Sequence, residues 1–169
     1  DDLDSLRIAY DRAVTMGSNL TVLGEHSPEF LLWAAQDANS AKLQRLQIIK
    51  GWLENGKAHE KVFDVACSDG GMVDSTNYRC PDNGARVDQD TCAISQGVGA
   101  GELSGLWRDP EYDPGQRAFY YVRVLENPTC RWSTWDAIKA GVPPREDLKA
   151  LIQERAWSSS IWLVPDHPP

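Results

Sequence analysis

The sequence predicts a mainly β protein, an antiparallel β-sandwich with an N-terminal helix and one or two short helical insertions. Two features of the 169-residue chain carry this prediction. Apolar stretches of strand length recur along it, and several alternate between apolar and polar positions as half-buried strands do. Clusters of Gly, Pro, Asn and Asp separate these stretches, as they do at turns between strands. A chain of this length is enough for one domain with its own core.

The first part of the chain predicts a helix and then a strand. Apolar residues between positions 3 and 14 form a loose helical stripe that stops at residues 16–19. We therefore expect residues 1–20 to be a helical segment that joins a preceding part of the protein, and residues 21–169 to be one sandwich-like domain. Residues 30–35 are a continuous apolar run, which predicts a buried strand.

The middle of the chain predicts a hairpin and, later, a central strand. Residues 43–53 favour a strand over a helix because they contain paired isoleucines and Gly51. The sequence Glu54-Asn55-Gly56-Lys57 is typical of a tight turn, and the alternating residues 61–67 would return antiparallel to the first strand. Residues 117–125 are apolar on both faces, so this strand should be central in its sheet.

The remaining segments predict a long loop, two short helices and two more strands. Residues 68–100 are rich in Asp, Gly, Ser and Asn, and a loop of this length needs support from covalent links or a ligand. Residues 102–107 predict a strand, and residues 157–164 predict a closing strand. Residues 132–140 suit a helix, and residues 145–155 suit a second one.

The charge and hydropathy of the chain exclude two classes of partner. The formal net charge is -8 and the basic residues are dispersed along the sequence, so a nucleic-acid backbone would be repelled. No apolar run is long enough to cross a bilayer, so we expect no membrane span. The chain begins Asp1-Asp2, with neither a basic start nor an apolar secretory core. Together with the helical start, this leads us to expect a fragment of a larger protein.

The four cysteines, Cys67, Cys80, Cys92 and Cys130, predict disulfides. Their number is even, three of them lie in or beside the polar loop, and none shows the short paired spacing of a zinc site. Disulfides imply an oxidising compartment, so we expect a periplasmic or secreted protein. Of the pairings open to four cysteines, our hypothesis joins Cys80 to Cys92 and Cys67 to Cys130. The first bridge would close a local loop, and the second would link a strand end to a distant turn.

Few residues have the pattern of a catalytic or binding site, and we expect neither a metal site nor a cofactor in this chain. His59 lies beside the hairpin turn and would need a partner and a nucleophile to act as a base; a strand-edge histidine is the plainer interpretation. Trp132 and Trp135, together with Arg131, form an aromatic cluster that suits a sugar or a protein surface. Core packing is the commoner reason for tryptophan.

Long motifs are spread over most of the chain. They are QIIKGW at residues 47–52, HEKVFDVA at 59–66, WRDP at 107–110, DPGQRAFYYVRVLE at 113–126, RWSTWDA at 131–137 and IQERAW at 152–157. In these motifs the chain resembles the C-terminal region of a bacterial family catalogued as domain of unknown function 3604. The resemblance covers nearly the whole chain, and the motifs are long enough to be specific.

The resemblance implies an exported protein whose N-terminal half is similar to the polymerase-and-histidinol-phosphatase (PHP) superfamily of metal-dependent phosphoesterases. The metal motifs of that half are absent from this sequence, so no catalytic residue carries over, and a divalent metal would belong to the missing half. This chain would then be a non-catalytic accessory domain whose partner is the N-terminal half of the same polypeptide. The positions that we select for the contact surface lie in the motifs above and are Arg117, Arg131, Trp132, Trp135 and Arg155.

Two other functions remain open. The chain could be a binding module for a carbohydrate or another small ligand, if Trp132 and Trp135 are exposed on one surface. Alternatively, it could be a hydrolase that uses His59 with a nearby carboxylate.

Overall fold

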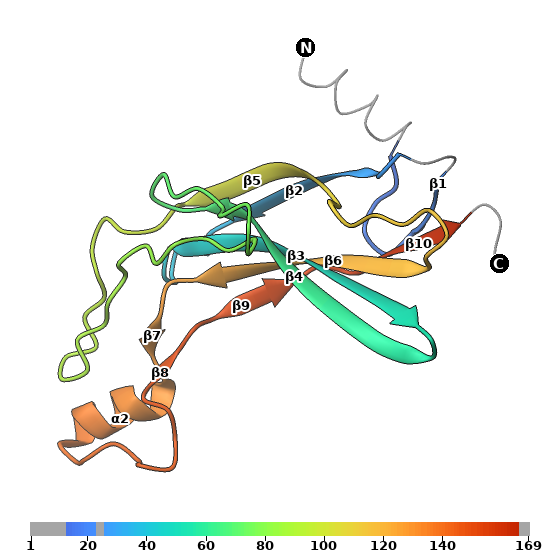
Figure 1. Ribbon diagram of the computed structural model, residues 1–169. Coiled ribbons are helices and arrows are strands. Elements are labelled where there is room, and N and C mark those ends of the chain that lie inside the picture. Colours follow the sequence, from blue (N-terminus) through green and yellow to red (C-terminus); the bar gives the residue numbers. More distant parts are fainter. Residues whose placement is uncertain (1–12, 23–25, 166–169) are drawn as a thin grey trace.

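The computed structural model describes residues 13–22 and 26–165, and Figure 1 shows their arrangement. The described elements are, in chain order, β1 (Asn19–Val22), β2 (Glu29–Ala35), β3 (Leu43–Glu54), β4 (Lys57–Cys67), β5 (Glu102–Arg108), β6 (Ala118–Glu126), β7 (Thr129–Cys130), α2 (Trp132–Ala140), β8 (Leu151–Ile152), β9 (Arg155–Trp157) and β10 (Ile161–Pro165). The predicted N-terminal helix falls largely on residues 1–12, which lie outside the described residues. No helix among the described residues is long and apolar enough to span a membrane.

The main sheet has six strands, and almost all of its pairings are antiparallel. Its order is β1-β10-β6-β3-β4, with β9 paired to the second half of β6, and only β1 and β10 run parallel. β2 and β5 form a separate antiparallel ribbon that lies over one face of this sheet (Figure 1). The predicted mainly β, antiparallel fold is confirmed. A sandwich is not confirmed, because the second layer in the described part of the chain is only this two-stranded ribbon.

The core lies between the ribbon and the main sheet. It contains Phe30 and Leu32 from β2, Leu46 and Ile48 from β3, and Phe63 from β4, all nearly or completely buried. The strand predicted at residues 30–35 is confirmed as β2, but the prediction that this strand is buried is wrong for one of its faces. Leu31 and Trp33 alternate with the core residues and are 73% and 61% exposed, because β2 contacts the sheet with only one face.

The hairpin and the central strand are confirmed. β3 and β4 pair antiparallel from Glu54↔Lys57 onward, and the turn residues Asn55 and Gly56 both have positive φ, 50° and 74°. This is the backbone geometry that an Asn-Gly turn supplies most readily. β6 lies between β3 on one side and β9 and β10 on the other, so it is central in its sheet as predicted.

A buried ion pair links β3 to the segment after β5. Lys50 Nζ lies 2.6 Å from Asp109 Oδ2 and also donates to the Glu111 carbonyl, and Tyr120 donates its hydroxyl to the same Asp109 oxygen. The second Asp109 oxygen accepts the Glu111 amide. Each buried polar group in this cluster therefore has a partner, which is the condition for burying charge at tolerable cost.

Tyr120 in this cluster makes the free energy of unfolding fall as the pH becomes alkaline. Burial, followed by the charge of Asp109 and the hydrogen bond to it, raises the pKa of Tyr120 well above its ordinary value. Because the pKa is higher in the folded state, the stabilisation is complete below the unfolded pKa of about 10 and is lost as pH rises above it. We expect the free energy of unfolding of Tyr120→Phe to fall less steeply than that of the wild type from about pH 9 to 11, measured by urea denaturation.

Gly51 allows Phe119 to lie flat against the sheet. A Cβ at residue 51 would lie 2.2 Å from Phe119 Cζ. We expect Gly51→Ala to cost about 1–3 kcal/mol of stability through overpacking. The penalty should largely disappear when Phe119 is also replaced by alanine, and a double-mutant cycle in denaturant measures this coupling. Gly101→Ala is the matched control, because its Cβ would meet only Gln36 Oε1 at 3.8 Å. Equal penalties with and without Phe119 would contradict the explanation.

The cysteines form two disulfides, but the predicted pairing is wrong. Cys67 is bonded to Cys80 and Cys92 to Cys130, and no described cysteine is free. The reason is that residues 78–80 run beside the end of β4, where the Asp64 amide donates to the Tyr78 carbonyl. That path brings Cys80 next to Cys67 at the end of β4, and Cys92, further along the loop, is bonded to Cys130 in β7.

The two disulfides should contribute unequally to stability. They close segments with sequence separations of 13 and 38 residues, for which the chain-entropy model gives about 3 and about 4 kcal/mol. We therefore expect the Cys92→Ala/Cys130→Ala variant to be less stable than the Cys67→Ala/Cys80→Ala variant in denaturant titrations. Peptide mapping without reduction is the direct check of the connectivity, and a Cys80–Cys92 peptide would contradict it.

The C-terminal part contains one of the two predicted helices among the described residues. α2 confirms the helix at residues 132–140, and it ends at Gly141, whose φ is 66°. The second helix predicted for residues 145–155 is wrong, since Leu151 and Ile152 form β8 against β7. The closing strand is divided into β9 and β10, which pair with successive halves of β6. The long loop at residues 68–100 is confirmed, with one disulfide at each end of it.

Candidate functional site

The main sheet has one face that the ribbon does not cover, which we call the open face. In the part of the chain that the structure describes, no helix or strand crosses it (Figure 1). The strand registers place the side chains there, because directly paired residues share a face. Gln47 pairs with Asp64 and with Arg123, and Gly51 pairs with Phe119. The open face therefore has an aromatic end around Phe119 and a polar end around Asp64.

The aromatic end consists of Phe119, Tyr121 and Trp162. The Phe119 and Trp162 rings have centroids 5.2 Å apart, and the Phe119 and Tyr121 rings are stacked at 6.3 Å. Trp162 remains 51% exposed, whereas Ile49, which pairs with Tyr121, is fully buried. Burial and then the charge of Glu60 raise the pKa of Tyr121, while Arg123 lowers it. The aromatic end is thus an apolar surface in contact with water.

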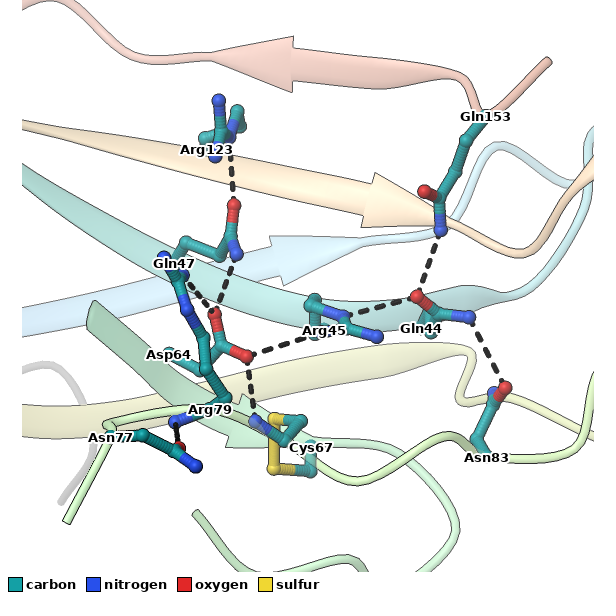
Figure 2. Close-up of polar contacts among 11 residues, drawn as sticks. Gln44, Arg45, Gln47, Asp64, Cys67, Asn77, Arg79, Asn83, Arg123 and Gln153 are labelled. Carbon is teal, nitrogen blue, oxygen red and sulfur yellow. Dashed lines mark hydrogen bonds and ion pairs between the residues drawn. A yellow bond between two sulfur atoms is a disulfide. The ribbon is translucent and has the colours of Figure 1, made fainter. Parts of the chain in front are cut away.

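The polar end is built on one buried carboxylate, that of Asp64 (Figure 2). One Asp64 oxygen accepts the Cys80 amide at 2.7 Å, and the other accepts the Gln47 side chain at 2.5 Å. Arg45 and Arg79 each place an Nη1 atom near the carboxylate, at 3.3 and 3.4 Å. The Asp64 side chain is completely buried, while those of Arg45 and Arg79 are 20% and 45% exposed. The arginines therefore reach from the carboxylate toward solvent.

Further polar contacts extend the polar end across the sheet. Arg123 donates its Nε to Gln47 Oε1 at 2.7 Å, so Gln47 connects Arg123 to Asp64 (Figure 2). Arg45 donates its Nε to Gln44, which also accepts from Gln153. A pocket of about 180 Å³, lined partly by Gln44, Cys67 and Asn83, lies at the border of this network. The chemistry that this arrangement suits is recognition of anions, since guanidinium groups present several donors in a fixed plane.

The predicted contact residues lie in three separate places. Trp132 and Trp135 are 68% and 41% exposed on α2, where Lys139 lies 5.8 Å from the Trp135 ring. Arg131 precedes α2 and donates its Nε to the Lys149 carbonyl. Arg117 is exposed immediately before β6, at the aromatic end of the open face. Arg155 is exposed on β9, beside the polar end. The structure thus does not bring these five residues into one surface.

His59 lies near the hairpin rather than in a pocket. Its ring stacks on Trp52 with centroids 5.4 Å apart, and its Nε2 atom lies 3.6 Å from a Glu54 oxygen. The His59 and Glu54 side chains are 38% and 60% exposed. Among the described residues, His59 lines neither the pocket beside Gln44 and Asn83 nor a second pocket beside Gln36 and Asn127. The same residues contain no group of three or more His, Cys, Asp or Glu side chains placed to hold a metal ion.

The polar end of the open face was not predicted from the sequence. Its members lie far apart along the chain, from residue 45 to residue 155, and only the strand register brings them together. One signal was available. Arg45 and Gln47 occupy alternate positions in β3, where the intervening positions are apolar, so one face of that strand had to be polar at this end.

Comparison with known proteins gives one match. A family profile described as "Protein of unknown function (DUF3604)" matches residues 1–165. No curated protein and no solved structure matches the chain. The profile covers almost all of the 169 residues, so the chain belongs to the DUF3604 family.

Proposed function

We propose that this chain is a non-catalytic accessory domain of an exported, PHP-like, metal-dependent hydrolase. In this proposal it packs against the N-terminal half of the same polypeptide through the aromatic end of its open face. The observation that carries the proposal is Trp162, which is 51% exposed on the open face and in contact with Phe119. Large exposed aromatic surfaces are typical of protein contacts, and tryptophan is prominent among residues that dominate binding energy.

The path of the chain before β1 supports this choice of surface. The Gly17 amide donates to the Ser160 carbonyl, and the Trp162 amide donates to the Ser18 carbonyl. Residues 17–22 therefore run along β10, the strand that carries Trp162. Any domain that precedes this segment is tethered next to the aromatic end, and a short tether gives a high effective concentration for docking.

The two disulfides support the exported location. Such bridges persist in the periplasm and outside the cell and are rare in the cytosol. The Cys67–Cys80 bridge closes a segment without a helix or strand of its own, and the Cys92–Cys130 bridge fastens the later part of the long loop to β7.

The test of the accessory role is a panel of phosphoester substrates assayed with the full-length parent and with this 169-residue chain. We expect metal-dependent activity in the parent alone. Turnover by the isolated chain that is lost in His59→Ala would instead favour the hydrolase that uses His59. An inactive parent would argue against the hydrolase.

The docking surface is tested separately by Trp162→Ser in the full-length parent. We expect the two halves to unfold independently in this variant, seen as separate transitions in calorimetry. Trp33→Ser is the matched control, since Trp33 is 61% exposed on the ribbon, away from the open face. If Trp162→Ser leaves the unfolding of the parent unchanged, the aromatic end is not the contact surface.

A second candidate function is supported by α2. Trp132 and Trp135 are one helical turn apart and both exposed, so their rings are available on one side of the helix. This arrangement favours a carbohydrate-binding module. Affinity electrophoresis with neutral polysaccharides tests it, and retardation that is lost in Trp132→Ala and in Trp135→Ala would support it.

A further inference from the structure

We propose that the polar end of the open face binds an acidic oligosaccharide. Arg45, Arg79, Arg123 and Arg155, which we call the arginine cluster, would bind its carboxylate or sulfate groups, and Trp157 would stack on a sugar ring. The proposal does not depend on the docking described above, because Trp162 lies at the other end of the open face.

The register of the sheet places these groups in two adjacent rows. In the first row, Asp64 pairs with Gln47, Gln47 with Arg123, and Arg123 with Trp157, across four strands. With strands about 4.8 Å apart, the row is about 14 Å long, roughly the length of two or three sugar units.

The second row adds two more arginines. It runs from Arg45 through Leu125 to Arg155, each two positions along its strand from a member of the first row. Residues two positions apart on a strand share a face, so Arg45 and Arg155 lie on the open face with Arg123. Arg79 joins them from the loop after β4, through its contact with Asp64.

The arginine cluster carries more positive charge than its acidic partner neutralises. Asp64 is the carboxylate in contact with Arg45 and Arg79, and Glu60 lies four residue pairs further toward the hairpin on the same face. Two guanidinium groups therefore contact one buried carboxylate, and those of Arg123 and Arg155 lie further along the same face, in a protein whose formal net charge is -8. A local excess of this sign attracts anions, most strongly where part of the surrounding surface excludes water.

Most donors of the arginine cluster remain available to a ligand. Arg123 and Arg155 donate through Nε only, to Gln47 and to the Gln153 carbonyl, and among the described residues their Nη groups have no acceptor. Arg45 and Arg79 each use one Nη atom, and Arg45 also its Nε atom. Since a guanidinium has five N–H donors, the free ones outnumber those in use.

The scaffold under the arginine cluster is held firmly. Asp64 is completely buried, and it accepts from the Gln47 side chain and from the amide of Cys80, which is itself bonded to Cys67. Gln47 is only 4% exposed and fixes the Arg123 guanidinium from below. Preorganised donors lose little entropy on binding, which favours recognition of a small ligand.

Two observations favour an acidic saccharide over other anions. Trp157 is 57% exposed and pairs directly with Arg123, so a flat apolar surface adjoins the charge. A sugar with a carboxylate or sulfate combines an apolar ring face with an anionic group. A long, densely charged polymer such as nucleic acid would extend beyond the arginine cluster and be repelled by the acidic remainder of the surface.

The test is isothermal titration calorimetry of the 169-residue chain with trigalacturonate, with neutral maltotriose and with a trinucleotide of mixed sequence. We expect trigalacturonate alone to bind, with an affinity that falls as salt is raised. Arg155→Gln and Arg123→Gln should each weaken binding by roughly tenfold, the effect of losing one charged hydrogen bond. Trp157→Ser should weaken it as well.

Arg145→Gln is the matched control, because Arg145 is a 67% exposed arginine that is paired with Asp147 outside the open face. It should bind as the wild type does, and circular dichroism melting would establish that all variants are folded. No binding of trigalacturonate, or equal binding of maltotriose, overturns the proposal. If Arg155→Gln and Arg123→Gln leave binding intact, the ligand binds elsewhere and the proposed site is wrong. If the trinucleotide binds and depends on these arginines in the same way, the proposal of a saccharide ligand is wrong.

Discussion

Asp109→Ala should lower the free energy of unfolding by about 3–5 kcal/mol, the cost of removing one member of a buried ion pair. Lys50 and Asp109 have side chains that are only 3% and 0% exposed. Without the carboxylate, the Lys50 ammonium keeps only the Glu111 carbonyl, and the Tyr120 hydroxyl loses its acceptor. A buried charge and a buried donor without partners are among the costliest defects that a single substitution produces.

The control for this effect replaces both charges. In Lys50→Met/Asp109→Leu no charge is left without a partner, so most of the loss should be recovered. Urea denaturation of the wild type, Lys50→Met, Asp109→Leu and the double variant gives the coupling energy between the two positions. If Asp109→Ala is as stable as the wild type, or if the double variant is less stable than both single variants, the ion pair does not act as described.

The strands could be predicted because their signal is local. Residues 43–53, the Asn55-Gly56 turn and residues 61–67 carry alternation and turn chemistry within the sequence itself, and these became β3, the hairpin and β4. The same signal cannot say how much of a strand is covered. Residues 30–35 were expected to form a buried strand, but the degree of burial depends on what packs against each face of β2 in space.

The disulfide pairing and the arginine cluster could not be predicted for the opposite reason. The pairing of Cys67 with Cys80 follows from the return of residues 78–80 along β4, which is a loop path and not a periodic pattern. The arginine cluster depends on Gln47, which pairs with Asp64 of β4 and with Arg123 of β6. β4 follows β3 through the hairpin, whereas β6 follows much later in the chain. Sequence patterns report which face of a strand is polar, but not which polar faces meet.

The error in the C-terminal region has a similar origin. Residues 145–155 have local features of a helix, yet Ile152 pairs with Thr129, and Arg155 with Leu125. Pairing of β8 with β7 and of β9 with the edge of β6 provides hydrogen-bond partners for the backbone groups of these strands. A helix in their place would be less stable, because isolated helices of this length are marginal in water. Tertiary contact therefore decided the structure against the local preference.

Asp64→Ala should also cost about 3–5 kcal/mol of stability, for reasons that involve the candidate site itself. The substitution leaves the Cys80 amide and the Gln47 side chain without their acceptor in a buried place. It also removes the one carboxylate that contacts Arg45 and Arg79 among the described residues, so two cations are left to repel each other. Denaturant titration measures the loss, and a variant within about 1 kcal/mol of the wild type would contradict this account.

Two further variants separate the geometry from the charge. Asp64→Asn keeps one acceptor oxygen for a backbone or side-chain amide but no negative charge, so it should be intermediate in stability. Asp82→Asn is the control for a solvent-exposed pair, because Asp82 and Arg86 are 63% and 69% exposed, and it should change stability little. The comparison matters for the arginine cluster, since Asp64 orders the arginines while its charge opposes the binding of an anion. The Asp64 carboxylate is expected to stabilise the fold and to lower the affinity for anions. Under conditions where Asp64→Asn is folded, this variant should therefore bind trigalacturonate more tightly than the wild type.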